Sequence, residues 1–151
     1  MIRIAQNIID EMIAHAQSEA PNECCGLLAG QGETVDEVYR IANLPSDDPA
    51  IAALKVPADR RFRYVMNPKE QLLAFKKMRE RETALVGIYH SHPHSAAYPS
   101  ATDVRLAFYA EVYYLIISLE DKDQPQVRAF RIVDRKITEE KIEVIGLGAA
   151  T

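Results

Sequence analysis

The segment His90–Asp103, HSHPHSAAYPSATD, combines three histidines with a closing aspartate. If His90 and His92 end a strand, the alternation of side chains places both imidazoles on one face and Ser91 on the other. Asp103, on the first turn of a following helix, can be brought back toward them by the loop 93–99. Zinc binds imidazole nitrogen and carboxylate oxygen, and a catalytic zinc site uses three protein ligands and leaves a fourth position for water. The segment therefore fits a zinc site made by His90, His92 and Asp103.

The same segment also fits an ordinary capped loop. Ser100 and Asp103 have the spacing of a helix capping box, with Asp in place of the usual Glu. A His-x-His pair alone is a weak indication of metal binding, and loop histidines are mostly solvated. The two interpretations are compatible, because Asp103 can both open a helix and bind a metal ion.

The elements that must position these residues follow from hydrophobic spacing and from Pro, Gly and capping residues. Predicted helices are 7–20, capped by Asn7 and ended by Pro21; 67–80, with Asn67, Pro68 and Glu70 at capping positions; and 100–111. Predicted strands are 23–30, 33–44, 62–67, 84–92, 112–120, 126–133 and 136–145. The segment 45–61, with three prolines and clustered acids, is expected to be a surface excursion that faces the substrate. Alternating helices and strands indicate an α/β fold, and 151 residues indicate a single domain, 1–151.

Composition excludes several classes of function. The net charge of −4 and the lack of a basic stripe argue against nucleic-acid binding. No segment approaches the ~20 apolar residues of a membrane helix, and the first residues lack the pattern of a signal peptide. The only two cysteines, Cys24 and Cys25, are adjacent and poor partners for a disulfide, so we expect a cytoplasmic protein.

These residues resemble the JAMM motif of the MPN+ zinc metalloproteases. The resemblance comprises His90-Ser91-His92-Pro93, the loop to Pro99, Ser100, Asp103 and the upstream glutamate in PNECCGLLAG, and the order of elements matches over about 4–120. It implies a cytidine-deaminase-like MPN (JAMM) domain with a central mixed, curved β-sheet flanked by helices. It also implies Zn2+ held by His90, His92 and Asp103, Glu23 as general base and then acid, and Ser100 as the donor that stabilises the oxyanion.

Five other residues are interpreted more plainly. His94 is expected to be solvated or on the substrate side, and His15 to be an ordinary helix residue. Cys25 shares a face with Glu23 while Cys24 faces the other way, and core packing is favoured for both. Tyr98 either covers the loop or contacts a substrate.

The resemblance implies a zinc-dependent hydrolase that cleaves peptide or isopeptide bonds after the C-terminal diglycine of a ubiquitin-like, sulfur-carrier-type β-grasp protein. The partner is then that protein or its conjugate, and whether the chain forms a homodimer is left open. The alternative is a non-catalytic MPN-type scaffold, although such relatives typically lose ligands. A zinc deaminase would need H-x-E and P-C-x-x-C, which do not occur. A DNA-repair role is disfavoured by the acidic charge.

Overall fold

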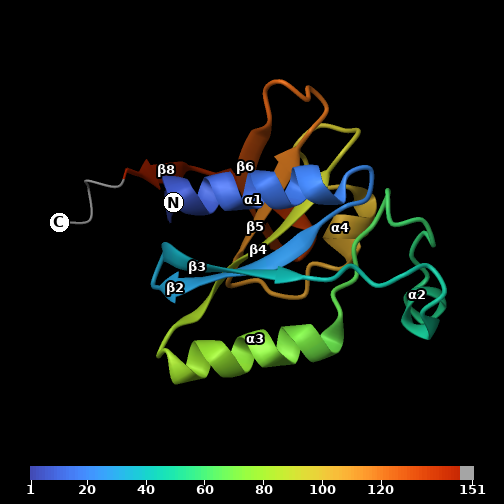
Figure 1. Cartoon of the computed structure of the whole chain (residues 1–151), viewed down its shortest axis with the longest axis horizontal. Coiled ribbons are helices and arrows are strands. Elements are labelled where there is room, and N and C mark those ends of the chain that lie inside the picture. Colours follow the sequence, from blue (N-terminus) through green and yellow to red (C-terminus); the bar gives the residue numbers. More distant parts are fainter. Residues whose placement is uncertain (147–151) are drawn as a thin grey trace.

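The computed structural model describes residues 1–146 (Figure 1). Its helices are α1 (Gln6–Glu19), α2 (Pro49–Leu54), α3 (Pro68–Glu80) and α4 (Ala101–Arg105). Its strands are β1 (Ile2–Ala5), β2 (Cys25–Gln31), β3 (Thr34–Ile41), β4 (Ala84–His92), β5 (Tyr113–Ser118), β6 (Gln126–Val133), β7 (Lys136–Glu140) and β8 (Ile142–Ile145). The α/β class predicted from the sequence is confirmed.

One mixed sheet organises these elements, in the strand order β7-β6-β5-β4-β2-β3-β1-β8. The central strand β4 is antiparallel to β2 and parallel to β5. Only Lys141 separates β7 from β8, yet these two strands lie at opposite ends of the strand order, β7 beside β6 and β8 beside β1. The sheet must therefore curve strongly, since consecutive residues join its two outer strands.

The two long helices cover opposite faces of the sheet, α1 on one and α3 on the other (Figure 1). The apolar residues of α1 that recur at three- and four-residue spacing, Ile8, Ile9, Met12 and Ala16, pack against one face of β2, β4 and β5. Ala74 and Met78 of α3 join the cluster on the other face. None of the helices within 1–146 has the length and apolar character needed to cross a bilayer.

Several elements differ from the prediction. Strand β1 was missed, and α1 begins at Gln6 after Ala5, so Asn7 does not cap it. The predicted strand 62–67 is wrong: this segment has only an isolated bridge between Met66 and Asn43, because the amide of Val65 donates to the Asn43 side chain. Helix α4 ends at Arg105, well before residue 111.

The predicted late strand 136–145 divides at Lys141 into β7 and β8. Asn67 caps α3 as predicted, through bonds from the amides of Lys69 and Glu70. The Glu70 carboxylate does not close a capping box there, because it accepts from the Ala42 amide instead.

Candidate metal centre

The histidines lie where the end of β4 meets the loop to α4. Alternation along β4 places the imidazoles of His90 and His92 on the same face, and both are buried. Ser91 points to the opposite face, where its Oγ accepts a hydrogen bond of 2.8 Å from the Cys24 amide. The Ser91 amide in turn donates to the Cys24 carbonyl at 3.1 Å, which fixes the residues next to Glu23 beside the end of β4.

Asp103 reaches the histidines through the capped start of α4. The Asp103 amide donates to Ser100 Oγ at 3.1 Å, and the Ser100 amide donates to Asp103 Oδ2 at 2.9 Å, so the predicted capping box is confirmed. The same Oδ2 lies 3.1 Å from Nε2 of both His90 and His92. The capping box therefore positions the Asp103 carboxylate beside the two imidazoles.

Three electron-rich atoms converge at this point. The His90 Nε2 and His92 Nε2 atoms are also 3.1 Å apart, so every pair among these two atoms and Asp103 Oδ2 is separated by the same distance. Ligands ~2.0 Å from one tetrahedral ion lie about 3.3 Å from each other. The spacing of the three atoms thus fits the edges of a metal coordination tetrahedron.

The tautomer of His92 supports this fit. Its Nδ1 lies 2.8 Å from the Ala96 carbonyl, an acceptor, so Nδ1 carries the hydrogen and Nε2 of the neutral ring presents a lone pair. That lone pair faces Asp103 Oδ2, and the contact needs a cation between them or a proton on Nε2. Burial lowers the pKa of His92, but the hydrogen bond and charge of Asp103 raise it above its ordinary value overall. Positive charge is therefore favoured at this position.

Glu23 lies on the other side of the histidines, just before β2. Atoms of Glu23, His90 and His92 that could bind a metal all lie within 4.8 Å of one another. Glu23 is 6% exposed, and its Oε1 has no hydrogen-bond partner within residues 1–146. Burial, reinforced by the nearby charge of Asp103, raises the pKa of Glu23 to about 9, against a smaller lowering by Arg63. The surroundings formed by residues 1–146 therefore favour the protonated form of this carboxyl group.

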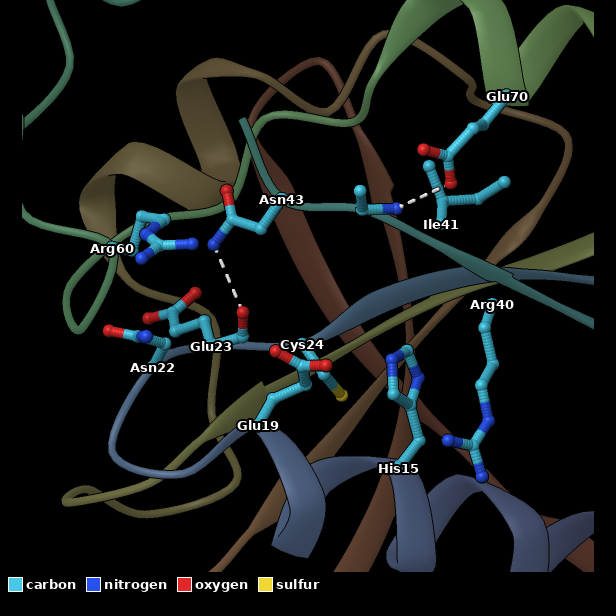
Figure 2. A pocket seen from close by; sticks show the side chains of 11 residues that line it. His15, Glu19, Asn22, Glu23, Cys24, Arg40, Ile41, Asn43, Arg60 and Glu70 are labelled. Atoms are coloured by element: carbon cyan, nitrogen blue, oxygen red, sulfur yellow. Dashed lines mark hydrogen bonds between the residues drawn. The ribbon is translucent and has the colours of Figure 1, made fainter. Parts of the chain in front are cut away.

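Asn43 and Arg63, which sequence reasoning missed, hold the backbone of Glu23. Asn43 Nδ2 donates to the Glu23 carbonyl at 3.0 Å (Figure 2). It also donates to the Arg63 carbonyl at 3.0 Å. Asn43 Oδ1 accepts from Arg63 Nη1 at 2.6 Å. The only signal in the sequence was an arginine between Phe62 and Tyr64, at a position that would otherwise be apolar.

Tyr64 was missed as well, and it stacks on His90 with 4.4 Å between ring centroids. His15, expected to be ordinary, is buried, and its Nδ1 lies 2.8 Å from the Tyr89 hydroxyl. The prediction of core packing for Cys24 and Cys25 is confirmed, since both are buried free thiols on opposite faces. His94 is exposed, and Tyr98 is 51% exposed with its ring against Phe130.

Comparisons with known proteins converge on one family. Residues 5–133 match the family described as prokaryotic homologs of the JAB domain. The chain is 35% identical to the CysO-cysteine peptidase of Mycobacterium tuberculosis over 142 residues, covering 94% of this chain and 90% of that protein. It is 32% identical to the desampylase of Haloferax volcanii, covering 78% and 80% of the two chains. It is also 32% identical to a probable TtuB-protein conjugate cleaving protease of Thermus thermophilus, covering 86% and 75%.

Solved structures agree with the sequence comparisons. The solution structure of a Desulfitobacterium hafniense protein has a TM-score of 0.80 and 38% identity, covering 97% of this chain and 94% of the other. A JAB1/MPN domain protein from Archaeoglobus fulgidus has a TM-score of 0.59 and 20% identity, covering 95% and 97%, and therefore shows a shared fold alone.

Proposed function

This chain belongs to the prokaryotic JAB-domain family, and we propose that it is a zinc-dependent peptidase that releases a ubiquitin-like carrier protein by cleaving the amide bond after its C-terminal diglycine. The observation that carries the proposal is the convergence of His90 Nε2, His92 Nε2 and Asp103 Oδ2 at 3.1 Å, with the buried carboxyl group of Glu23 beside them. The names of three relatives, a CysO-cysteine peptidase, a desampylase and a TtuB-conjugate protease, support the reaction class and the substrate class.

In the proposed assignment His90, His92 and Asp103 hold the metal ion and Glu23 stays outside its coordination sphere. Asp103 is favoured as the third ligand because its Oδ2 already contacts both imidazoles. When bound, a zinc ion polarises the scissile carbonyl and lowers the pKa of a water molecule.

Glu23 and Ser100 supply the remaining chemistry. Glu23 takes the proton from the attacking water and passes it to the departing nitrogen. Burial and the charge of Asp103 raise its pKa, and a cation held by the neighbouring ligands would oppose both effects and favour the ionised carboxylate that this role requires. Ser100 Oγ accepts the Asp103 amide, so its own hydrogen is free to donate to the oxyanion that forms on the scissile carbonyl. The positions of both residues thus support roles in proton transfer and charge stabilisation.

The test is the substitution Glu23→Gln, which keeps the size and polarity of the side chain but removes its basicity. Cleavage of a carrier conjugate should slow by about 100-fold or more, the scale of losing a general base, while the zinc content stays at the wild-type level. Glu80→Gln, on the exposed end of α3, is the matched control and should leave turnover unchanged. Turnover of the Glu23→Gln variant within a few-fold of wild type would reject the mechanism, and stable binding of the conjugate by the wild type without cleavage would favour a scaffold.

A further inference from the structure

A polar cavity of about 280 Å³ opens beside Glu23 and extends to the end of β3, where Arg40 and Ile41 line it (Figure 2). Glu23, Asn22 and Arg60 line one side of it, and Arg40 and His15 line another. Because Glu23 is proposed to protonate the departing nitrogen, a cavity that Glu23 itself lines is placed to receive the group attached to that nitrogen. The proposal below therefore rests on the proposed function.

Arg60 is fixed next to Glu23 through the backbone. The Glu23 amide donates to the Arg60 carbonyl at 2.9 Å. The neighbouring Arg63 holds this part of the chain in place, since its Nη2 donates to the Ala58 carbonyl at 2.9 Å and its Nε to the Pro57 carbonyl at 3.0 Å. The position of Arg60 relative to the proposed general base is thus determined by hydrogen bonds on both sides.

Arg60 is half-buried, and its guanidinium lacks a hydrogen-bond or ion-pair partner within residues 1–146. Arg79 and Arg135 also lack such partners there, but both are exposed to solvent. The other arginine of the cavity, Arg40, is bound to Glu11 at 2.7 Å, and Arg61 is bound to Asp59. Arg60 is therefore the cation of this cavity that remains available to a ligand.

The cavity also contains carboxylates, which limits where an anion can bind. Glu70 accepts from the Ala42 amide and lies at the opposite side from Arg60 (Figure 2). Glu19 is exposed, at the end of α1. The lining therefore accommodates one carboxylate bound to Arg60, next to a neutral or positively charged nitrogen at Glu23.

We propose that the departing group is a free α-amino acid and that Arg60 binds its α-carboxylate, making Arg60 a determinant of leaving-group specificity. In such a group the carboxylate carbon lies about 2.5 Å from the scissile nitrogen, so its binding site must adjoin the residue that protonates this nitrogen. Guanidinium matches carboxylate with two parallel hydrogen bonds. A lysine side chain of a protein conjugate places no carboxylate there, so the site discriminates against isopeptide substrates.

The experiment compares substrates that differ only in the charge next to the scissile bond. A diglycine-ended β-grasp protein from the same genome is extended by one cysteine carrying either a free carboxylate or a carboxamide, and a third conjugate joins the diglycine to a lysine side chain. The wild type should prefer the carboxylate over the carboxamide by roughly 10- to 100-fold in kcat/KM, the range expected for a charge-assisted bidentate contact. Arg60→Ala should reduce this preference to about 2-fold or less and leave cleavage of the carboxamide and of the lysine conjugate unchanged.

Two further variants control for structural effects. Arg60→Lys should retain part of the preference because it keeps the charge, and Arg61→Ala should retain all of it because Arg61 is exposed and paired with Asp59. Equal rates on carboxylate and carboxamide by the wild type, or an equal loss on both in Arg60→Ala, would overturn the assignment and leave the proposed function standing. Failure of the wild type to cleave any of the three conjugates would instead reject the proposed function, and the inference with it.

Discussion

Substituting Arg63 by Met should destabilise the protein strongly and loosen the segment that covers the site. The side chain is 1% exposed and is bound by carbonyl and amide oxygens rather than by a carboxylate. Its guanidinium donates to the Pro57 carbonyl at 3.0 Å, Asn43 Oδ1 at 2.6 Å, the Leu44 carbonyl at 2.8 Å and the Ala58 carbonyl at 2.9 Å. Methionine fills most of the volume and donates no hydrogen bond, so these four oxygens lose their donor.

The expected loss in the free energy of unfolding is the balance of two opposing contributions. A hydrogen bond to a charged group contributes roughly 1.5–3 kcal/mol, so four would give about 6–12 kcal/mol if taken at face value. Burial of the guanidinium, which lowers the pKa of Arg63, offsets part of this, and some of the freed carbonyls can turn to water. We therefore expect a loss of about 3–5 kcal/mol in the free energy of unfolding, the cost of leaving about two of the four buried oxygens without a donor at roughly 1–3 kcal/mol each.

Urea denaturation measures this loss directly. With a slope of about 2 kcal/mol per M, the midpoint should fall by roughly 1.5–2.5 M. Arg61→Met is the matched control: its partner Asp59 is on the surface, where an ion pair adds little to stability, so the urea midpoint should stay close to that of the wild type. Limited proteolysis at low temperature should cut the segment 45–61 faster in the Arg63 variant. An unfolding free energy within ~1 kcal/mol of wild type, with the segment still resistant, would refute the role assigned to Arg63.

Two other predictions concern metal binding and pH. Alanine at any one ligand should reduce the zinc content of the purified protein from about one per chain to a small fraction of that, as measured by elemental analysis; retention of zinc in all three variants would contradict the assignment. These ligands are His90, His92 and Asp103. Burial, then the charge of Arg40, lowers the pKa of His15 from 6.5 to about 4, so the unfolded chain binds a proton more readily. Stability should therefore fall by up to about 3 kcal/mol as the pH drops from 6.5 to 4. His15→Gln should flatten this part of the pH profile of thermal unfolding while His94→Gln, on the exposed loop, should not; identical slopes for all three proteins would refute it.

The sequence predicted the parts of the molecule that depend on local spacing. Alternation along 84–92 placed His90 and His92 on one face, and the spacing of Ser100 and Asp103 predicted the capping box that the structure contains. These features involve residues within a few positions of each other, so the period of a strand or of a helix turn suffices to find them.

The spacing of residues along the sequence did not predict features that depend on contacts between distant parts of the chain. Strand β1 has only four residues and pairs with β3 and β8, which lie far along the chain, so its short apolar pattern merged with that of α1. The strand predicted over 136–145 is divided at Lys141 because β7 pairs with β6 and β8 pairs with β1. The alternation of residues along this segment is unbroken, so it does not indicate that the two halves have different partners. Asn43 and Arg63 are joined by a hydrogen bond although they lie twenty positions apart in the sequence. A periodic pattern of residues does not indicate a contact of this kind.

Glu23 illustrates the same limit within the site. Its distance along the chain from the histidines gave no local signal, and its role was suggested only by the resemblance to the JAMM motif. In the structure, pairing of Cys25 with His90 across β2 and β4 brings Glu23 to the imidazoles. The sheet register, rather than the motif, completes the candidate site.

The central claim, metal-dependent cleavage after a diglycine, is tested most directly by the intact mass of the carrier after incubation of a conjugate with the enzyme. The purified protein should give a product that ends at the second glycine. Removal of the metal by a chelator should abolish this product, and addition of zinc should restore it. Undiminished cleavage by fully metal-free protein, or a cut at any bond other than the one after the diglycine, would contradict it.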